Sequence, residues 1–502
     1  MNESLPVAVI GAGPVGLAAA ARLVERGITP VVLERGAAAG AAVAEWGHVR
    51  VFSPWSYNID AAARALLEPA GWTAPDPDAL PTGAEIVRDY LAPLAGHLAI
   101  APHLRLNATV TGIARAGLDR MTTAGRDDAP FAVRWRDAGG GEHTTLARAV
   151  IDASGTWERP NPMGVDGLPV PGEAAAAGRI AYAMPDVLGL ERAAYAGKRV
   201  LVVGSGHSGM NVVLDLLRLQ DEVPGTRVLW ALRRNRLDKL VGGGAADQLR
   251  ERGALGLAAR RAIDEGRLEV LAPFAAERVA LSGDGVAVDG RVDGAAMRLE
   301  VDRVVVATGF RPALEMLGEL RVALDPIMQA PPALAPLIDP NEHSCGTVPP
   351  HGAAELSQPE AGFYIVGMKS YGRAPTFLMA TGYEQVRSVV AEIAGDHAAA
   401  REVRLVLPET GVCSIAPAAA GDAAACCGPA PAKAAAAGCC APAAPAPVKV
   451  AAAAAASCCG GPAPADADAC CVADAVAKDA GKSGCGCGPA PADRTPELVD
   501  AR

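Results

Sequence analysis

The stretch from Val7 to Arg35, VAVIGAGPVGLAAAARLVERGITPVVLER, is the strongest indication of the fold of this chain. An apolar segment, Val7–Ile10, leads directly into a loop with three glycines, and an alanine-rich helix follows. In a strand–loop–helix unit of this kind, Gly11 allows the tight turn, Gly13 lets the backbone approach a pyrophosphate, and Gly16 lets the helix pack close to the strand. The first N–H groups of the helix then face the phosphates. The stretch therefore predicts a dinucleotide-binding Rossmann-like unit.

The next predicted strand, Val31–Leu33, ends at Glu34, at the distance of about twenty residues where such units carry an acidic side chain. A carboxylate there can hold a ribose diol, and it repels a 2′-phosphate. Glu34 and the three glycines are therefore predicted to bind the adenosine part of FAD or NAD rather than NADP.

A second stretch, Lys198–Leu217, repeats the pattern in the letters KRVLVVGSGHSGMNVVLDLL. An apolar strand again runs into a glycine loop, and a helix follows. The residues predicted to bind a nucleotide here are Gly204, Gly206, Ser208 and Gly209.

Two arginines, Arg233 and Arg234, end the next predicted strand of this second unit, where the first unit has Glu34. Two guanidinium groups suit bidentate capture of a phosphate, so this site is predicted to bind NADPH. The alternative is that the two arginines lie in solvent at the end of a strand and bind no nucleotide. Two dinucleotide sites in one chain imply hydride transfer from a nicotinamide to a second, redox-active dinucleotide, for which FAD is the natural candidate.

Charge and composition exclude several classes of protein. The 502 residues carry a formal net charge of −10, without the clustered Lys and Arg that nucleic-acid binding requires. The first residues, MNESLP, contain no basic region, and no apolar run reaches the length of a membrane span. We therefore expect a cytoplasmic protein with no nucleic-acid partner and no membrane partner.

The order of these patterns predicts an α/β fold in which an FAD-binding Rossmann-like domain contains an inserted NADPH-binding Rossmann-like domain. The apolar strand Asp302–Ala307 is expected to return the chain to the first domain, and a helix is expected over Gly382–Ile393. The segments Phe131–Arg136 and His143–Ala147 are expected to form a hairpin. The predicted boundaries are 1–165 for the first part of the FAD domain, 166–300 for the NADPH domain, 301–410 for the return and 411–502 for a tail.

Eleven of the twelve cysteines lie in the tail, between Cys413 and Cys487, so the body has no disulfide framework. The tail is otherwise alanine, proline and glycine, which cannot bury enough apolar surface to fold, and we expect it to be disordered. Adjacent thiolates can chelate one soft ion such as As(III), Cu(I) or Zn(II). A dithiol that relays electrons to or from the flavin, and no role at all, are the alternatives. The predicted metal ligands are Cys426, Cys427, Cys439, Cys440, Cys458, Cys459, Cys470 and Cys471.

The body of the chain, with its two glycine motifs, resembles the two-dinucleotide-binding flavoproteins. VVVATGFRP, with Ala307–Gly309, is similar to the connector by which those proteins re-enter the FAD domain, and Ala153–Gly155 is similar to the connector by which they leave it. The segment GFYIVGMKSYGRAP…TGYEQ stands where the superfamily has its last flavin-contacting strand and helix. The resemblance thus implies that Gly309, Gly367 and Gly382 contact the cofactor.

Within that superfamily the chain resembles the flavin-containing monooxygenases, in which NADPH reduces FAD and the reduced flavin reacts with O₂. The dithiol reductases need a cysteine pair in the body, and residues 1–344 contain no cysteine. GSGHSG is similar to the NADPH fingerprint of the monooxygenases. Ala41 replaces a glycine of their second motif, and their tyrosine-threonine-asparagine signature is absent, so Asn58 is the nearest analogue of its catalytic asparagine.

The stretches EWGHVRVFSPW and MKSYGRAPTF also resemble the flavin-binding monooxygenases encoded in bacterial arsenic-resistance operons. That resemblance implies a soft or thiophilic substrate. Cys345, between His343 and His351, is a candidate to bind such a substrate, the alternative being a structural loop with one free cysteine and two surface histidines. Lys369, Tyr371 and Arg373 either contact flavin or substrate or form the solvated face of a loop.

The sequence therefore predicts an FAD- and NADPH-dependent oxidoreductase of the monooxygenase type. It acts on a small-molecule substrate with O₂, and its tail binds a soft metal or metalloid ion. The alternatives are an NADPH-dependent flavin reductase of a metal, a metalloid or a disulfide, and a metal-sequestering protein whose flavin body is inactive. The sequence leaves open whether the protein is a homodimer.

Overall fold

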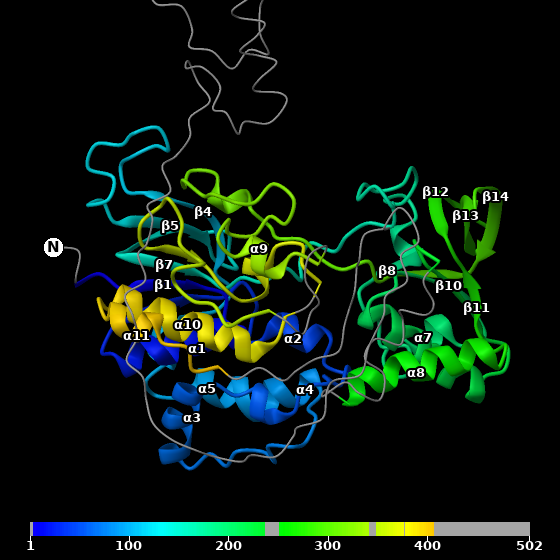
Figure 1. Ribbon diagram of the computed structural model, residues 1–502, viewed down its shortest axis with the longest axis horizontal. Coiled ribbons are helices and arrows are strands. Elements are labelled where there is room, and N and C mark those ends of the chain that lie inside the picture. Colours follow the sequence, from blue (N-terminus) through cyan, green and yellow to red (C-terminus); the bar gives the residue numbers. More distant parts are fainter. Residues whose placement is uncertain (1–3, 236–249, 341–347, 376, 406–502) are drawn as a thin grey trace, which may run out of the picture. The chain divides into compact units, whose positions relative to one another are not determined.

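The computed structural model describes residues 4–235, 250–340, 348–375 and 377–405. In these ranges the chain forms two five-stranded parallel sheets and two three-stranded antiparallel sheets (Figure 1). The expected α/β class with Rossmann-like parallel sheets is confirmed. The tail predicted at 411–502, with all its candidate metal ligands, and Cys345 lie outside the described residues.

The first lobe of the protein contains the first glycine stretch. Its elements before the chain leaves it are β1 Val7–Ile10, α1 Pro14–Glu25, β2 Pro30–Leu33, α2 Ala41–Glu45, η2 Trp55–Tyr57, α3 Ala61–Leu67, η3 Glu68–Ala70, α4 Gly83–Ile86, η4 Val87–Leu91, α5 Ala92–Gly96, η5 Ala101–His103, β3 Leu104–Arg105, β4 Thr109–Arg115, β5 Phe131–Arg136, β6 Glu142–Ala147 and β7 Ala149–Asp152. Those after its return are η9 Glu315–Leu317, α9 Ala335–Ile338, β16 Phe363–Ile365, η10 Gly367–Tyr371, α10 Met379–Ile393 and α11 His397–Arg401. The main sheet has the strand order β16-β7-β1-β2-β3.

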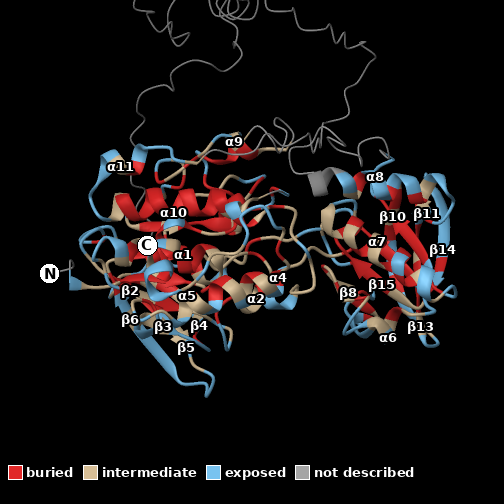
Figure 2. Cartoon of the chain, turned by 90° about the horizontal axis from the view of Figure 1, so that it is seen from below, coloured by how far each residue is buried: buried red, intermediate tan, exposed pale blue. Residues whose placement is uncertain are grey.

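The core of the first lobe lies where α1 packs against the sheet and α10. Four consecutive alanines of α1, residues 18–21, are completely buried, because a helix with small side chains can approach its neighbours on all sides. Gly382 serves the same close packing, since a Cβ atom there would lie 2.5 Å from Cγ2 of Val15. Figure 2 shows these helices among the most buried parts of the lobe. The expected helix at Gly382–Ile393 is present as part of α10.

The second lobe contains the second glycine stretch. Its elements are η6 Ala177–Arg179, β8 Ile180–Tyr182, α6 Arg192–Tyr195, β9 Arg199–Val203, α7 His207–Glu222, β10 Arg227–Ala231, α8 Arg250–Asp264, β11 Glu269–Leu271, β12 Phe274–Ser282, β13 Gly285–Val292, β14 Ala295–Val301 and β15 Arg303–Val306. The parallel sheet has the order β11-β10-β9-β15-β8, and β12-β13-β14 form an antiparallel sheet of their own.

The strand expected at Asp302–Ala307 exists as β15, but the prediction that it returns the chain to the first domain is wrong. β15 pairs in parallel with β9 and β8, inside the second sheet. Its residues Val304–Val306 are buried, as is usual for a strand between two neighbours in a covered parallel sheet. The run of apolar residues predicts that a strand is buried, but it does not identify the strands with which that strand pairs. The return therefore comes after β15.

The expected hairpin is confirmed, with β5 and β6 paired around Ala138–Gly141 and β4 added at the other edge of β5. No helix in the described ranges is both long enough and apolar enough to cross a membrane.

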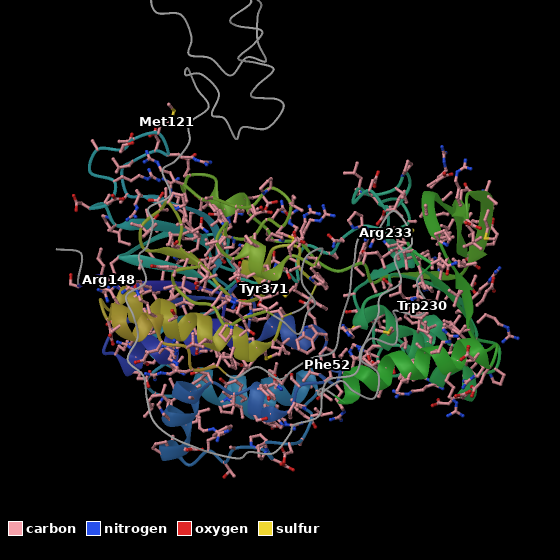
Figure 3. The ribbon with its side chains drawn as sticks, viewed as in Figure 1. Phe52, Met121, Arg148, Trp230, Arg233 and Tyr371 are labelled. Carbon is pink, nitrogen blue, oxygen red and sulfur yellow. The ribbon has the colours of Figure 1, made fainter. Side chains whose placement is uncertain are left out.

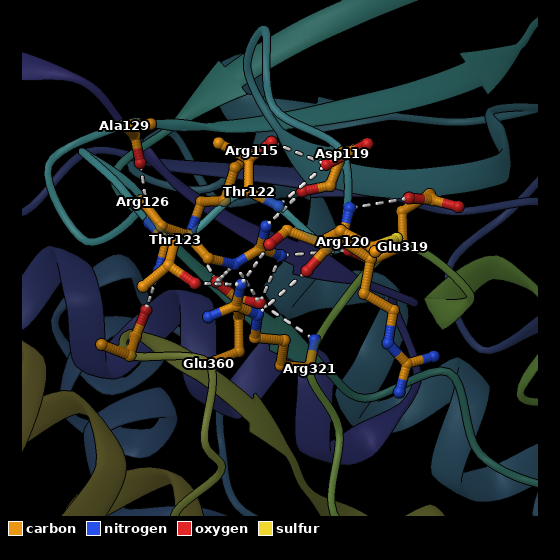
Figure 4. Close-up of polar contacts among 12 residues, drawn as sticks. Arg115, Asp119, Arg120, Thr122, Thr123, Arg126, Ala129, Glu319, Arg321 and Glu360 are labelled. Atoms are coloured by element: carbon orange, nitrogen blue, oxygen red, sulfur yellow. Dashed lines mark hydrogen bonds and ion pairs between the residues drawn. The ribbon is translucent and has the colours of Figure 1, made fainter. Parts of the chain in front are cut away.

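A buried ion cluster fastens the long connection between β4 and β5 to the returning chain (Figure 4). The Glu360 carboxylate accepts from Arg115 Nε at 2.7 Å and from Arg126 Nη2 at 2.7 Å, and the backbone N–H of Arg321 also donates to it. All three side chains of the ion pairs are at most 3% exposed. Burial acts to raise the pKa of Glu360, but the hydrogen bonds from the arginines outweigh it and lower that pKa. One carboxylate thus balances two buried cations.

Replacing Glu360 with glutamine is expected to lower the free energy of unfolding by about 3–5 kcal/mol, because two buried guanidinium groups lose their counter-charge. Urea unfolding of the full chain measures this loss. Glu142→Gln, in the exposed pair of Arg136 and Glu142, is the matched control and should cost about 1 kcal/mol or less. Equal losses in the two variants would contradict the assignment.

Candidate functional site

The first glycine loop has the geometry of a dinucleotide cradle. Gly11 follows β1 with φ of 97°, and its N–H donates to Leu33 O at the end of β2. A Cβ atom at position 11 would lie 2.9 Å from Ala153 O, and one at position 16 would lie 2.0 Å from Gly11 O. Only glycine fits these two positions, because the turn and the helix approach other backbone so closely.

Open space lies beside Gly13, where a Cβ atom would have no other atom within 4 Å, and no described side chain caps the N-terminus of α1. Glu34 stands at the edge of this space. Its carboxylate accepts from the N–H of Ala12 at 2.6 Å and from the N–H of Gly36 at 2.7 Å. Uncapped helix N–H groups beside open space suit phosphate oxygens, and the carboxylate is held at the loop for a diol. The residues present therefore fit FAD or NAD.

The second glycine loop has the same geometry as the first. A Cβ atom on Gly204 would lie 2.2 Å from Ala307 O, and one on Gly209 would lie 2.5 Å from Gly204 O. Beside Gly206 no atom lies within 4 Å of the corresponding point, and Ser208 belongs to the first turn of α7. The helix again carries no side-chain cap at its N-terminus. Both lobes therefore present a comparable loop at the carboxyl edge of a parallel sheet.

The hydrogen bonds of the two loops correct the expected place of the arginines. Gly11 N donates to Leu33 O, and Gly204 N donates to Ala231 O, so the position equivalent to Glu34 is Leu232. Leu232 is buried, and the exposed Arg233 and Arg234 come one and two positions later (Figure 3 labels Arg233). The second loop thus lacks a carboxylate at the position where one would repel a 2′-phosphate.

The two connectors between the lobes are bonded to each other. The N–H of Asn161, in the outgoing connector, donates to Gly309 O at 2.8 Å, and Thr308 Oγ1 donates to Asn161 O at 2.8 Å. Trp157 stacks on Phe310 with ring centroids 4.9 Å apart. Gly309 therefore has a structural partner in the outgoing connector, and its predicted contact with the cofactor stays a prediction.

A buried polar network holds Gly367, another predicted cofactor contact. Its N–H donates to Gln385 Oε1 at 2.7 Å, and Gln385 Nε2 donates to Ser370 Oγ and to His351 Nε2, both at 2.9 Å. His351 Nε2 therefore accepts, and its Nδ1–H donates to Pro349 O at 3.0 Å. His351 is only 3% exposed, so the alternative of a surface histidine is wrong for this residue. Both of its ring nitrogens bond to protein atoms.

Three side chains expected to share one environment are in fact divided. Lys369 and Tyr371 are buried, whereas Arg373 is exposed. Tyr371, labelled in Figure 3, packs on the ring of His351 at 5.6 Å and on that of Phe377 at 5.0 Å. A solvated loop face is therefore wrong for the first two residues, whereas for the exposed Arg373 both interpretations stay predictions. Sequence patterns could not separate them, because the distant residues that cover Lys369 and Tyr371 decide their burial.

Asn58, the predicted catalytic asparagine, is buried and bonded within its own segment. Its Nδ2 donates to Ser53 O at 2.7 Å and to Pro54 O at 3.0 Å, and its Oδ1 accepts from Ser53 Oγ. Tyr383 on α10 donates to Asn58 O at 2.8 Å. Both amide hydrogens thus serve local structure, and a catalytic role for this residue stays a prediction.

Asp60, the N-cap of α3, is a buried carboxylate in the same region. It accepts from Arg22 Nη2 at 2.8 Å, and its N–H donates to the hydroxyl of Tyr90. Burial raises its pKa, while the charge of Arg22 opposes that change. Burial also raises the pKa of Tyr90 and Tyr383. These groups join α1, α3, η4 and α10 around the segment that carries Asn58.

The described part of the chain holds no group of three or more His, Cys, Asp or Glu side chains placed to bind a metal ion. The predicted metal ligands of the tail and Cys345 lie outside the described residues, so both predictions stay open.

The part of the sequence that contains the two glycine loops matches a known family. Residues 5–329 match the family described as pyridine nucleotide-disulphide oxidoreductase. The chain belongs to this family. This is a family of FAD-binding pyridine nucleotide oxidoreductases, so the membership confirms the expected flavoprotein class. The resemblance to the monooxygenases of arsenic-resistance operons stays a prediction.

The proteins similar in sequence or in fold include monooxygenases and a reductase. The indole-3-pyruvate monooxygenase YUCCA6 of Arabidopsis thaliana is 33% identical over 212 residues, 41% of this chain and 44% of the plant protein. The chain thus spans less than half of that relative. The bacillithiol disulfide reductase Bdr of Bacillus cereus has TM-score 0.57 at 18% identity, covering 78% of this chain and 99% of that chain. DfoA, the FAD-bound cadaverine monooxygenase of Erwinia amylovora, has TM-score 0.55 at 14% identity, covering 81% and 98%. At these identities the two structures show a shared fold.

The network around Gly367 makes stability depend on the neutral form of His351. Burial lowers its pKa, against the opposing charges of Glu355 and Glu384. The unfolded chain binds the proton more readily, so the stabilisation is complete above the unfolded pKa of about 6.5 and is lost as pH falls toward the folded pKa. We expect His351→Gln to flatten the fall in unfolding free energy between pH 8 and pH 5.

Urea unfolding at several pH values measures this slope. His143→Gln, at an exposed histidine of β6, is the control. Its free energy of unfolding should fall between pH 8 and pH 5 as steeply as that of the wild type. An unchanged slope in His351→Gln would show that this group does not titrate with unfolding.

Proposed function

We propose that this protein is an FAD- and NADPH-dependent monooxygenase that acts on a soft or thiophilic small molecule. The observation that carries the proposal is the difference between two cradles of the same geometry. Glu34 borders the first, whereas the buried Leu232 stands at that position in the second and is followed by Arg233 and Arg234. The first cradle suits a ribose diol and the second suits a 2′-phosphate.

In this proposal the two cradles hold different cofactors. The FAD ligands are Gly11, Gly13, Gly16 and Glu34, with Gly309, Gly367 and Gly382 in the supporting segments. The NADPH ligands are Gly204, Gly206, Ser208, Gly209, Arg233 and Arg234. Bound FAD supplies acceptance of hydride from NADPH and reaction with O₂. The protein supplies orientation, through two glycine turns that are each packed against a connector.

The sequence supports a monooxygenase over a dithiol reductase. Residues 1–344 contain no cysteine, so the body lacks the pair to which a reductase flavin passes electrons. The partial similarity to a plant monooxygenase favours the same interpretation. The paired tail cysteines and the resemblance to arsenic-operon monooxygenases favour a thiophilic substrate such as As(III). The alternative is an NADPH-dependent reductase of a metalloid or of the tail's own disulfides.

Oxygen dependence separates the two functions. The purified full chain should contain FAD, and with NADPH and trivalent arsenic compounds it should consume O₂ and NADPH in equal amounts while releasing little hydrogen peroxide. An oxygen electrode, NADPH absorbance and a peroxide assay measure this stoichiometry. NADPH oxidation that continues without O₂ while the thiols of the protein are reduced would favour the reductase, and protein without flavin would contradict both.

Replacing both Arg233 and Arg234 with alanine should raise the KM for NADPH by about tenfold or more, because charge-assisted hydrogen bonds to the phosphate are lost. The KM for NADH should stay nearly unchanged, since NADH has no 2′-phosphate. Steady-state kinetics with both nucleotides measure the ratio. Arg218→Ala, at an exposed arginine of α7 paired with Asp215, is the control. An equal change for NADH and NADPH would contradict the phosphate assignment.

A further inference from the structure

Lys369, on η10, is a completely buried lysine. Its side chain is 0% exposed, and Nζ lies 2.7 Å from Oδ2 of Asp152, whose side chain is also 0% exposed. Lysine is almost never fully buried unless it is paired, because its ammonium loses its hydration. Asp152 is the last residue of β7, more than two hundred positions away in the sequence. The pair therefore ties the end of a central strand to the last segment of the first lobe.

Ser154 closes this pair into a ring. Its hydroxyl donates to Asp152 Oδ1 at 2.6 Å and accepts from Lys369 Nζ at 3.0 Å. Its backbone N–H also donates to Asp152 Oδ1, at 3.1 Å. Lys369 Nζ approaches Oδ2 away from the direction of a good hydrogen bond, so its directional hydrogen bond goes to the hydroxyl of Ser154. We call Asp152, Ser154 and Lys369 the lysine triad.

The lysine triad stands directly behind the first glycine loop. Asp152 is the parallel-sheet partner of Ile10, the residue before Gly11. A Cβ atom on Gly11 would lie 3.2 Å from the Cα of Ser154 and 2.9 Å from Ala153 O. The connector that begins at Ala153 is therefore the wall against which the glycine turn packs. The triad therefore holds this wall through Ser154.

The energetics of buried ion pairs favour a positioning role for the lysine triad over a stabilising one. A buried ion pair recovers its desolvation cost only with good geometry, and well-packed apolar residues in its place often leave stability unchanged or raise it. Lys369 is fully covered by protein, so its ammonium does not line the open space beside Gly13. Any effect on a bound dinucleotide must pass through Ser154 and the connector.

We propose that Lys369 is a positioning residue for the first cradle: through Ser154 and Asp152 it holds the connector at Ala153 in the place that lets the Gly11 turn receive a dinucleotide. The inference rests on the proposed binding of FAD at this loop. It assigns to the triad a share of the FAD affinity and of the environment of the bound flavin.

The test compares Asp152→Asn/Lys369→Met with wild-type protein in the full chain, because asparagine keeps an acceptor for the N–H and hydroxyl of Ser154. The double variant removes both charges together, so the fold should persist, with a melting temperature of the apo-protein within about 5 °C of wild type. The dissociation constant for FAD, measured by quenching of flavin fluorescence, should rise about tenfold or more because the wall of the cradle shifts. The visible absorption bands of bound FAD should also move.

The matched control is Asp221→Asn/Arg267→Met, which neutralises an ion pair of the second lobe between α7 and the turn after α8. Its FAD affinity should stay within about twofold of wild type, since distant sites act independently. Ser154→Ala keeps both charges, and it replaces the double variant as the test if that variant does not fold. We expect Ser154→Ala to bind FAD more weakly than the wild type. Wild-type affinity and spectrum in a folded double variant, or in Ser154→Ala when it alone can be tested, would overturn the inference. Absence of FAD binding in the wild type would instead overturn the proposed function.

Discussion

The first lobe depends on a close backbone approach between the turn after β1 and the first turn of α1. The carbonyl oxygen of Gly11 occupies the place where residue 16 would carry a side chain, and Ala153 O closes in on Gly11 from the neighbouring strand. Any side chain at either position would push the helix off the sheet or the turn off the connector. The alanines of α1 extend this close approach along the helix, and Gly382 repeats it where α10 crosses α1. The open space beside Gly13 lies between these two close approaches in the sequence.

The second lobe applies the same constraint with a different electrostatic border. Ala307 O closes on Gly204 as Ala153 O closes on Gly11, so each loop rests on a connector that joins the lobes. The two connectors in turn bond to each other through Asn161 and Thr308. What distinguishes the lobes is the residue after the second strand, a carboxylate in one and a buried leucine in the other. The chemistry that we propose, with two different dinucleotides, follows from that difference.

Buried charged and polar groups hold the segments that surround the loops. Glu360 joins two buried arginines across the excursion after β4, and Gln385 joins His351 to the backbone of Gly367. The lysine triad does the same at the end of β7. Each arrangement is costly unless complete, because an unpaired buried charge or polar atom loses its hydration without compensation. Such groups therefore specify one arrangement of the returning chain.

Local sequence patterns are enough to predict the two glycine cradles, the strand and helix of each, the hairpin of β5 and β6, and the absence of a cysteine pair from residues 1–344. These follow from local spacing, since a turn, a helix start and a strand are each encoded within a few neighbouring residues. Three outcomes required the folded chain: the sheet that β15 joins, the equivalence of Leu232 rather than Arg233 to Glu34, and the burial of Lys369 and His351. Those outcomes depend on partners distant in the sequence, such as Asp152 for Lys369 and Gln385 for His351. The pattern of residues around a position describes its own segment, but burial and pairing are properties of the segments that fold against it.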